Sequence, residues 1–282
     1  MQKSYENRLK RAKKALDEAE YVLIGGGSGL SSAAGLTYSG RRFEENFADF
    51  IRRYHVTDMY SAGFTPFPSE EEKWAYWSRH ILFNRYLPPA LPLYLTLYAL
   101  VKDKKYFVLT TNVDGAFSKA GFEEARLFEA QGNYGLFQCA KGCHDTLYDN
   151  EASVRAMAEV QKDCRIPARL VPSCPVCGGK MEVHVRKDAF FVQDAAWYRA
   201  AERYREFLSQ AEGKRTALLE LGVGFNTPTI IRFPFERLTH RNAATTLIRV
   251  NRDFPEGAEE NGERTVAFSE NMLRVIEGLT LA

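Results

Sequence analysis

Short apolar runs alternate with longer amphipathic stretches along this chain. The short runs, rich in β-branched and aromatic residues, lie at 21–24, 106–111, 217–224 and 246–251. Runs of this length and composition are typical of strands that are buried on both faces of a parallel sheet. Apolar residues recur at helical spacing over about 4–19, 70–86, from about 195, and 269–279. Strands that alternate with helices predict an α/β fold with a Rossmann-like, doubly wound parallel sheet.

Glycine and polar residues stand directly after predicted strands, where a doubly wound sheet binds its ligands. The glycine-rich stretch 25–35 follows the first strand and leads into a plausible helix start. Such a turn can present backbone N–H groups to a phosphate, but glycine can also serve only to avoid a steric clash. Asn112 and Asp114 follow the second strand, where they could contact a substrate or simply form a turn. Taken singly, these motifs leave both alternatives open.

Four of the five cysteines form two closely spaced pairs. Cys139 and Cys143 make a C-x3-C motif, and Cys174 and Cys177 make a C-x2-C motif followed by two glycines. Two such pairs can bring four thiolates to one tetrahedral Zn²⁺, so we predict one structural zinc per chain. Buried cysteines without a metal are the alternative. A four-sulfur site has no open ligand position, and we therefore assign it a folding role and no catalysis.

Composition and charge narrow the possible functions. The chain has 282 residues, a formal net charge of +2, and no uninterrupted apolar run long enough to cross a bilayer. A charge so close to neutral gives no support to a nucleic-acid partner, and no segment indicates a membrane partner. The N-terminal segment is charged throughout and contains no secretory signal. We therefore expect a cytoplasmic protein whose cysteines bind metal in preference to forming disulfides.

In order along the chain, the motifs resemble those of the sirtuin family. The family's glycine loop is similar to Gly27-Ser28-Gly29-Leu30-Ser31 and the following Gly35-Leu36. Its T-Q-N-I-D-G motif is similar to Thr110-Thr111-Asn112-Val113-Asp114-Gly115, and its later strand ends are similar to Gly222-Val223-Gly224 and Val250-Asn251. The resemblance covers about residues 21–279. It implies a Rossmann-like sheet, a smaller zinc-bearing and helical lobe, and NAD bound between them as co-substrate.

The resemblance also assigns segments and residues. It implies a single domain, 1–282, with a Rossmann-like lobe of about 1–40, 101–135 and 190–282, a helical insertion of about 41–100, and a zinc-binding module of about 136–189. The catalytic residues that it implies are Asn112, Asp114 and Gln131. The NAD contacts that it implies are Gly27, Ser28, Gly29, Ser31, Gly35, Leu36, Tyr38, Asn112, Asp114, Gln131, Gly222, Val223, Gly224, Asn251 and Arg252.

Two departures from the sirtuin pattern change the implied activity. Gln131-Gly132 stands where sirtuins carry a His-Gly pair whose histidine is the general base, and a glutamine amide does not titrate. Thr37-Tyr38-Ser39-Gly40 replaces the family's P-D-F-R. This combination resembles the macrodomain-linked, class M sirtuins of microbes. It implies protein mono-ADP-ribosylation without efficient deacylation, a lipoylated acceptor similar to the glycine-cleavage H protein, and a macrodomain protein as functional partner.

Other functions fit parts of the pattern. An NAD-dependent deacylase would keep the sirtuin reaction without its histidine, and a catalytically inactive sensor would only bind NAD or ADP-ribose. A zinc-ribbon nucleic-acid binder is the third alternative, and the near-neutral charge counts against it. Seven aromatic residues within 43–100 predict either the core of a helical module or, in part, a wall of the nicotinamide and acceptor channel. They are Phe43, Phe47, Phe50, Tyr54, Phe64, Trp74 and Trp77.

Overall fold

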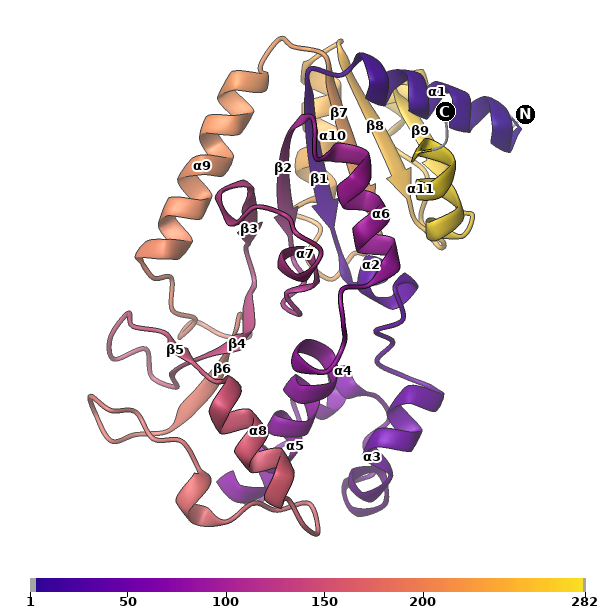
Figure 1. The fold of residues 1–282 in the computed structure, drawn as a ribbon. Coiled ribbons are helices and arrows are strands. Elements are labelled where there is room, and N and C mark those ends of the chain that lie inside the picture. The colour runs from indigo at the N-terminus through magenta and orange to yellow at the C-terminus, as the bar shows by residue number, and fades with distance from the viewer. Residues whose placement is uncertain (1–3, 281–282) are drawn as a thin grey trace.

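The computed structural model describes residues 4–280 and contains a six-stranded parallel sheet, which lies in the upper part of Figure 1. In spatial order the strands are β3 (Leu127–Glu129), β2 (Lys105–Thr110), β1 (Tyr21–Gly26), β7 (Thr216–Leu221), β8 (Thr245–Val250) and β9 (Thr265–Phe268). Every neighbouring pair runs parallel. The strand order reverses between β1 and β7, which makes a crevice at their carboxyl ends. The sheet confirms the Rossmann-like α/β fold that the alternating runs predict.

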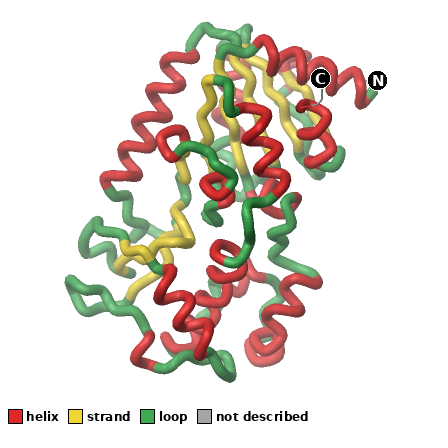
Figure 2. The backbone as a smooth tube through the Cα atoms, viewed as in Figure 1, coloured by secondary structure: helices red, strands yellow, loops and turns green. Residues whose placement is uncertain are grey.

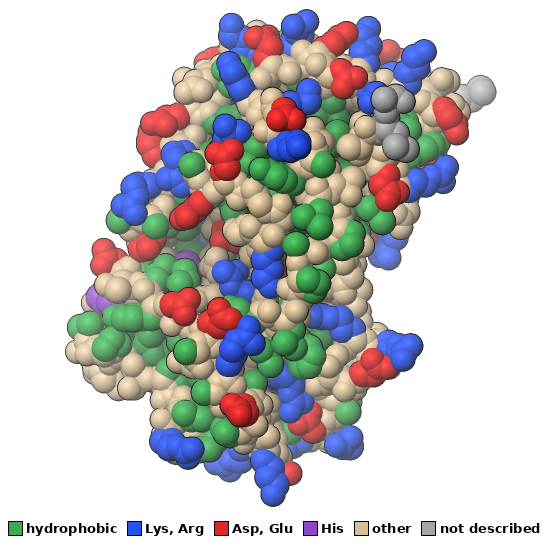
Figure 3. All heavy atoms as spheres, in the orientation of Figure 1, with side chains coloured by type: hydrophobic (Ala, Val, Ile, Leu, Met, Phe, Trp, Pro, Cys, Tyr) green, Lys and Arg blue, Asp and Glu red, His purple; other side chains and the backbone are tan. Residues whose placement is uncertain are grey.

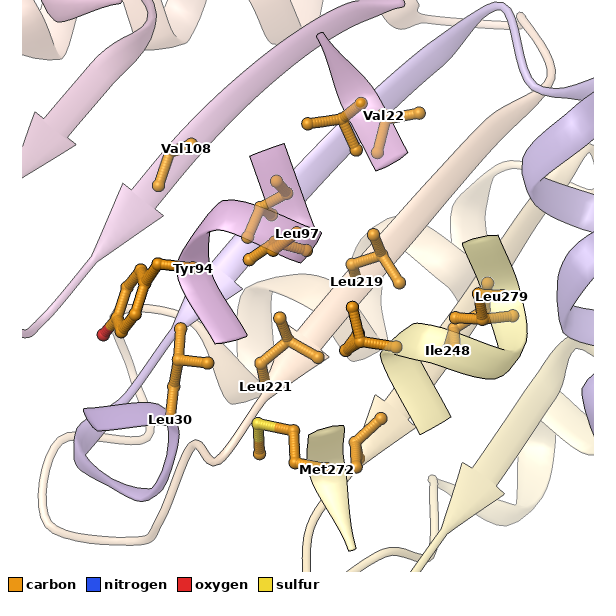
Figure 4. Close-up of a cluster of buried hydrophobic side chains, with 14 of the residues drawn as sticks. Val22, Leu30, Tyr94, Leu97, Val108, Leu219, Leu221, Ile248, Met272 and Leu279 are labelled. Atoms are coloured by element: carbon orange, nitrogen blue, oxygen red, sulfur yellow. The ribbon is translucent and has the colours of Figure 1, made fainter. Parts of the chain in front are cut away.

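Helices cover both faces of this sheet. One face packs against α1 (Tyr5–Glu18), α2 (Ser28–Ala33), α6 (Pro92–Val101), α7 (Ala116–Lys119) and α11 (Met272–Thr280). Figure 4 shows Leu97 of α6 and Leu279 of α11 in one cluster with Leu219 and Ile248 of the strands. The other face packs against α9 (Ala195–Ala211) and α10 (Arg232–Arg241). Burial from both sides explains why the strands are almost uniformly apolar.

A second part of the molecule carries a helical group and a smaller sheet (Figure 2). Its helices are α3 (Arg41–Tyr54), α4 (Met59–Ala62), α5 (Glu70–Ile81) with the π-helix η1 (Leu82–Tyr86), and α8 (Glu151–Val160). Its antiparallel strands are β5 (Tyr148–Asp149), β4 (Gly132–Cys139) and β6 (Met181–Val185). Short 3-10 helices occur at η2 (Glu124–Arg126), η3 (Ala168–Leu170) and η4 (Glu259–Arg264).

Aromatic residues join the helical group and the smaller sheet in one core. Phe43, Phe47 and Phe50 of α3 are buried there, and the Trp74 ring of α5 lies 4.8 Å from the Phe137 ring of β4. The core interpretation is therefore confirmed for these aromatics. Phe64 differs from them, because it is 57% exposed. It lies instead on the wall of the pocket described below.

The predicted helix over 70–86 changes its winding partway. It is an α-helix as far as Ile81 and a π-helix from Leu82 to Tyr86, before Pro88 and Pro89. A π-helix is rare and is often found at functional sites. Apolar spacing alone does not distinguish the two windings over a single turn, so the sequence predicts only one continuous helix.

The surface carries charges of both signs. Figure 3 shows Lys and Arg side chains interspersed with Asp and Glu over the face that is visible there. This mixture agrees with the net charge of +2. No helix within residues 4–280 is both long and apolar enough to cross a lipid bilayer.

Candidate active site

A pocket of about 290 Å³ lies at the carboxyl ends of β1, β2 and β7, where the strand order reverses. One side consists of the loops that follow those three strands. The other side comes from α4, from β4 and from the end of β6. The pocket therefore lies between the parallel sheet and the second part of the molecule.

Most of the predicted site residues line this pocket. Those that do are Gly27, Ser28, Ser31, Leu36, Tyr38, Asn112, Asp114, Gln131, Val223 and Gly224. The sequence places them in four separate segments, and the fold brings them together. Gly29, Gly35, Gly222, Asn251 and Arg252 are not part of the lining.

Gly29 and Gly222 contribute by letting two loops meet backbone to backbone. The Gly29 N–H donates to the Gly222 carbonyl at 2.9 Å. A Cβ on Gly29 would lie 2.8 Å from the Gly222 Cα, and Gly222 has a φ of +62°. Only glycine fits this approach without strain. The steric explanation thus holds for these two glycines. It also holds for Gly27, where a Cβ would lie 2.6 Å from the Gly222 carbonyl oxygen, although Gly27 and Gly224 both line the pocket.

Asn251 and Arg252 lie on the loop after β8. The Asn251 amide donates to the Val223 carbonyl at 2.8 Å, and its side-chain oxygen accepts from the N–H groups of Asp253 and Phe254. Asn251 therefore supports the loop that carries Val223. The Arg252 side chain is exposed and pairs with Asp253 at 2.9 Å. A solvated pair of this kind contributes little to stability.

Ser31, Asn112 and Asp114 form one buried hydrogen-bond network. The Ser31 hydroxyl donates to Asp114 Oδ2 at 2.5 Å, and the Asn112 amide donates to Ser31 Oγ at 3.0 Å and to the Gly27 carbonyl at 2.9 Å. The Ala116 N–H donates to Asp114 Oδ1 at 2.9 Å. Burial raises the pKa of the Asp114 carboxyl, and the hydrogen bonds from Ser31 and Ala116 oppose that rise.

Tyr94 of α6 also belongs to this network, although it does not line the pocket. The sequence did not predict it as a site residue. Its hydroxyl lies 2.9 Å from Ser31 Oγ, whose own hydrogen is donated to Asp114. The tyrosine is fully buried, so the network is closed off on the side away from the pocket. Nothing local distinguishes Tyr94 from the other tyrosines of its segment, because its role arises from the packing of α6 against the sheet.

Gln131 lies in the link between β3 and β4 and is one of the residues that line the pocket. Its carbonyl accepts from the Arg186 N–H at 2.9 Å. Gly132 follows with a φ of +105°, and a Cβ there would lie 2.1 Å from the His184 carbonyl oxygen. Glycine at 132 thus lets β4 turn against β6, and this turn presents Gln131 to the pocket.

Glu129 is a second acidic residue near this link. Its carboxylate accepts from the Asn133 amide at 2.6 Å. Burial raises the pKa of Glu129 to about 7, although the charge of Arg85 and the Asn133 hydrogen bond act in the opposite direction. The raised pKa belongs to a residue two positions before Gln131, whose amide does not titrate.

Several pocket residues were not predicted from the sequence. They include Tyr60, Tyr134, Val185, Arg186, Asn226 and Thr227. Each lies on an irregular loop, a short helix or the smaller sheet, where no motif signals a function. Strand alternation does not link Tyr134 to Gln131, because the two are three residues apart and side chains on one face of a strand recur every two residues.

The four paired cysteines meet in space. Their sulfur atoms all lie within 4.8 Å of one another, and the Sγ atoms of Cys139 and Cys177 are 3.8 Å apart, as are those of Cys143 and Cys174 at 3.7 Å. Four sulfurs around one tetrahedral zinc would be about 3.8 Å apart. Backbone N–H groups lower the pKa of Cys139 and of Cys174, which favours thiolates there, while burial and the neighbouring sulfurs raise the pKa of Cys143. The residues therefore fit a structural Zn²⁺.

Comparisons with known proteins identify relatives of this chain. No family model matches it. A protein ADP-ribosyltransferase of Staphylococcus aureus is 38% identical over 263 residues, which cover 93% of this chain and 84% of that protein. A probable bifunctional ADP-ribose hydrolase/ADP-ribosyltransferase of Fusarium oxysporum is 34% identical over 256 residues, which cover 87% of this chain and 42% of that protein.

Solved structures share the fold at low sequence identity. A Sir2 homologue in complex with NAD has a TM-score of 0.61 at 14% identity, over 96% of this chain and 92% of that one. Sir2Tm bound to a propionylated peptide has a TM-score of 0.60 at 16% identity, over 95% of both chains. The structures show the fold, and the staphylococcal relative shows the family. The chain belongs to a family of protein ADP-ribosyltransferases, enzymes that here have the sirtuin (Sir2) fold.

Proposed function

We propose that this chain is an NAD-dependent protein mono-ADP-ribosyltransferase of the macrodomain-linked, class M type. The observation that carries the proposal is the presence of Asn112, Asp114 and Gln131 in one pocket at the crevice of the sheet. The side chain in the position of the sirtuin base cannot take up a proton near neutral pH. The pocket thus keeps the polar groups for NAD but lacks the titrating group for deacylation.

In this proposal the network around Ser31 orients the nicotinamide end of NAD. Breaking the bond between nicotinamide and ribose leaves positive charge on the ribose carbon, so the co-substrate must be held in one pose. Ser31 fixes Asp114 relative to Asn112 through two hydrogen bonds. Asp114 would accept from the nicotinamide carboxamide, and Asn112 would hold the ribose hydroxyls or a water.

In this proposal Gln131 permits transfer of ADP-ribose but does not support deacylation. Deacylation needs a base that activates a ribose hydroxyl, and the loss of a general base typically costs about 10²–10⁴-fold in rate. The amide of Gln131 can still donate and accept hydrogen bonds, so it can orient the ribose or the acceptor. The remaining reaction is transfer of the ADP-ribosyl group to an external nucleophile.

The proposed acceptor is a lipoylated carrier similar to the glycine-cleavage H protein, in the cytoplasm and with a macrodomain protein as functional partner. The class M resemblance of Gln131 and of Thr37-Tyr38-Ser39-Gly40 supports this assignment. The name of the fungal relative combines an ADP-ribose hydrolase with an ADP-ribosyltransferase, which agrees with a macrodomain partner. The exposed rings of Tyr60 and Phe64, 5.2 Å apart on the pocket wall, offer apolar surface to an acceptor.

The test is transfer of label from NAD to a lipoylated carrier protein, run beside deacetylation of an acetyl-lysine peptide. We expect label on the lipoylated carrier, little on the unlipoylated carrier, and no appreciable deacetylation. Gln131→Ala should weaken transfer by removing a positioning contact. Gln131→His should restore little deacylase, because Thr37-Tyr38-Ser39 still departs from the sirtuin loop.

Each alternative function has its own outcome in this experiment. Robust deacetylation by the unmodified protein would favour the deacylase. Binding of ADP-ribose without release of nicotinamide would favour the inactive sensor. Transfer to other proteins but not to the lipoylated carrier would keep the transferase and overturn the proposed acceptor.

A further inference from the structure

Two charged side chains lie inside buried strands of the parallel sheet. Glu220 of β7 and Arg249 of β8 are partners in the strand register, and both are 0% exposed. The guanidinium of Arg249 donates to both carboxylate oxygens, from Nε at 2.7 Å and from Nη2 at 2.9 Å. Apolar side chains in a buried position often stabilise a fold as well as an ion pair does, so stability alone does not account for this pair.

Two residues of α10 complete a charge cluster around the pair. Arg249 Nη1 lies 2.7 Å from Glu236 Oε1, and Arg232 Nη1 lies 3.6 Å from Glu220 Oε1. The side chain of Arg232 is 7% exposed. The charge cluster therefore consists of Glu220, Arg232, Glu236 and Arg249, with two charges of each sign.

The arginines of the charge cluster hold the loop that follows β8. Arg249 Nη1 donates to the Glu256 carbonyl at 2.5 Å. Arg232 Nη2 donates to the carbonyls of Phe254 at 3.1 Å and of Glu256 at 3.2 Å. These bonds fix the backbone of residues 254–256, and they use the planar array of donors that a lysine does not have.

Arg232 also contacts the loop that follows β7. Its guanidinium carbon lies 4.5 Å from the centre of the Phe225 ring, a favourable distance for a cation above an aromatic ring. The Phe225 and Phe254 rings meet edge-on, with centroids 5.1 Å apart. Arg232 thus touches the backbone of one loop and the aromatic ring of the other.

Phe225 lies between residues that line the pocket. Gly224 precedes it, Asn226 and Thr227 follow it, and all three belong to the lining. Residues 223–227 belong to no helix or strand, so side-chain contacts have to hold them in place. Asn251 supports the beginning of this segment through the Val223 carbonyl, and the contacts of Phe225 support its middle.

We propose that Arg232 is a positioning residue for the pocket: through the Phe225 ring it holds residues 224–227 in the arrangement that binds the ADP-ribosyl part of NAD. This inference rests on the proposed transferase function. Arg232 itself is not among the residues that line the pocket, so it acts through Phe225 and takes no part in breaking the bond to nicotinamide. The competing explanation is that Arg232 only balances the charge of Glu220.

Two variants separate positioning from charge balance. Arg232→Lys keeps a positive charge beside Glu220 but loses the planar group that contacts Phe225 and the two carbonyls. Phe225→Leu keeps the hydrogen-bond donors of Arg232 and removes a ring that is 49% exposed. In each variant we expect KM for NAD to rise roughly three- to tenfold, with kcat within about twofold of the wild type.

The double variant tests whether the two residues act through one contact. If they do, its KM should be close to that of the more severe single variant, because both substitutions remove the same contact. Phe233→Leu is the matched control. Phe233 is 41% exposed on α10, next to Arg232, and is not part of the pocket lining, so this variant should leave KM unchanged.

The experiment measures kcat and KM for NAD with the full chain and a lipoylated carrier protein. Calorimetry gives the Kd of ADP-ribose for the same proteins, and thermal unfolding checks that each variant is folded. We expect the Kd of ADP-ribose to rise by the same factor as KM in Arg232→Lys and in Phe225→Leu.

The outcomes separate this inference from the function on which it rests. A wild type that binds no ADP-ribose would overturn both. Binding without transfer would overturn the proposed function, and the Kd values of the variants would then decide the role of Arg232. Unchanged KM and Kd in Phe225→Leu would overturn the positioning role alone. A fall in kcat at unchanged KM, or a double variant whose effect is the product of the two single effects, would overturn it as well.

Discussion

At the scale of single residues, hydrogen bonds hold the Asp114 carboxylate in one orientation. Asp114 is 6% exposed, and both carboxylate oxygens accept hydrogen bonds. Asp114→Asn places N–H hydrogens where the carboxylate now accepts from Ser31 or from the backbone of Ala116. We expect transfer to fall by about 10²-fold or more through lost orientation, with the fold retained. The measurement is kcat/KM with labelled NAD, beside circular dichroism.

Asn112 provides a second test of the same network. Asn112→Ala removes the donors to Gly27 and Ser31 and should cause a comparable loss. Asp103→Asn is the matched control, because Asp103 is exposed and precedes β2, at the end of the strand away from the pocket. Near wild-type transfer in both pocket variants would place the reacting atoms elsewhere.

Glu129 should make the stability of the protein depend on pH. Burial raises its pKa from 4.5 to about 7, so the folded chain binds this proton more tightly than the unfolded chain. The free energy of unfolding that Glu129 contributes is therefore highest below pH 4.5 and falls as the pH rises through about 7. Glu129→Gln should remove this pH dependence. The difference between the melting temperature of the variant and that of the wild type should therefore grow in favour of the variant as the pH rises.

Thermal unfolding of both proteins at several values from roughly pH 5 to pH 8 measures how each melting temperature changes with pH. Glu206→Gln is the control, because Glu206 is exposed on α9 and the substitution changes the side-chain chemistry in the same way as Glu129→Gln. Parallel curves for Glu129→Gln and the wild type would contradict the assignment.

Local motifs predict some pocket residues and miss others for a physical reason. Asn112 and Asp114 follow a strand directly, so their position at the ligand-binding edge can be inferred from the chain alone. Tyr134 and Arg186 reach the same pocket because β4 and β6 pair in a separate sheet. That pairing joins segments far apart in the sequence, and no local pattern records it.

At the scale of elements, the cysteine cluster should hold the second part of the molecule together. Cys139 and Cys174 belong to the same buried cluster as Trp74 and Phe137. We expect about one zinc per chain, and Cys174→Ser should lose both the metal and the folded state of this region. The measurements are metal content by mass spectrometry and thermal unfolding with and without chelator.

The fifth cysteine is the natural control for that prediction. Cys164 is buried but lies outside the four-sulfur cluster. Cys164→Ser should keep its zinc, whatever its effect on stability. A metal-free wild-type protein with unchanged melting temperature would contradict a structural zinc.

Long, buried strands were predicted from the sequence more accurately than short ones. β1, β2, β7 and β8 begin and end within a few residues of the predicted runs, because each is a buried strand of six residues. β3 and β9 have three and four residues, too few to show a period. The division into lobes near residues 40, 100, 135 and 190 stays a prediction.

At the scale of the whole molecule, a bound ligand should stabilise both parts at once. The pocket takes Asn112 and Gly224 from the loops of the sheet and Tyr134 and Arg186 from the second part. ADP-ribose at 100 times its Kd should raise the free energy of unfolding by about 2.7 kcal/mol. Thermal unfolding with and without ADP-ribose measures this. Asn112→Ala should lose most of the shift, and an undiminished shift in that variant would contradict the site.

The order of the strands in the sheet also determines when each strand can pair with its neighbours during translation. β1 is made early and lies between β2 and β7, yet β7 begins about 190 residues after β1 ends. At about 5–20 residues per second, the ribosome needs roughly 10 to 40 seconds to cover that interval. During this time one edge of an apolar strand lacks its final neighbour. The nascent chain therefore carries an open edge at what will become the middle of its sheet, and slower translation lengthens that exposure.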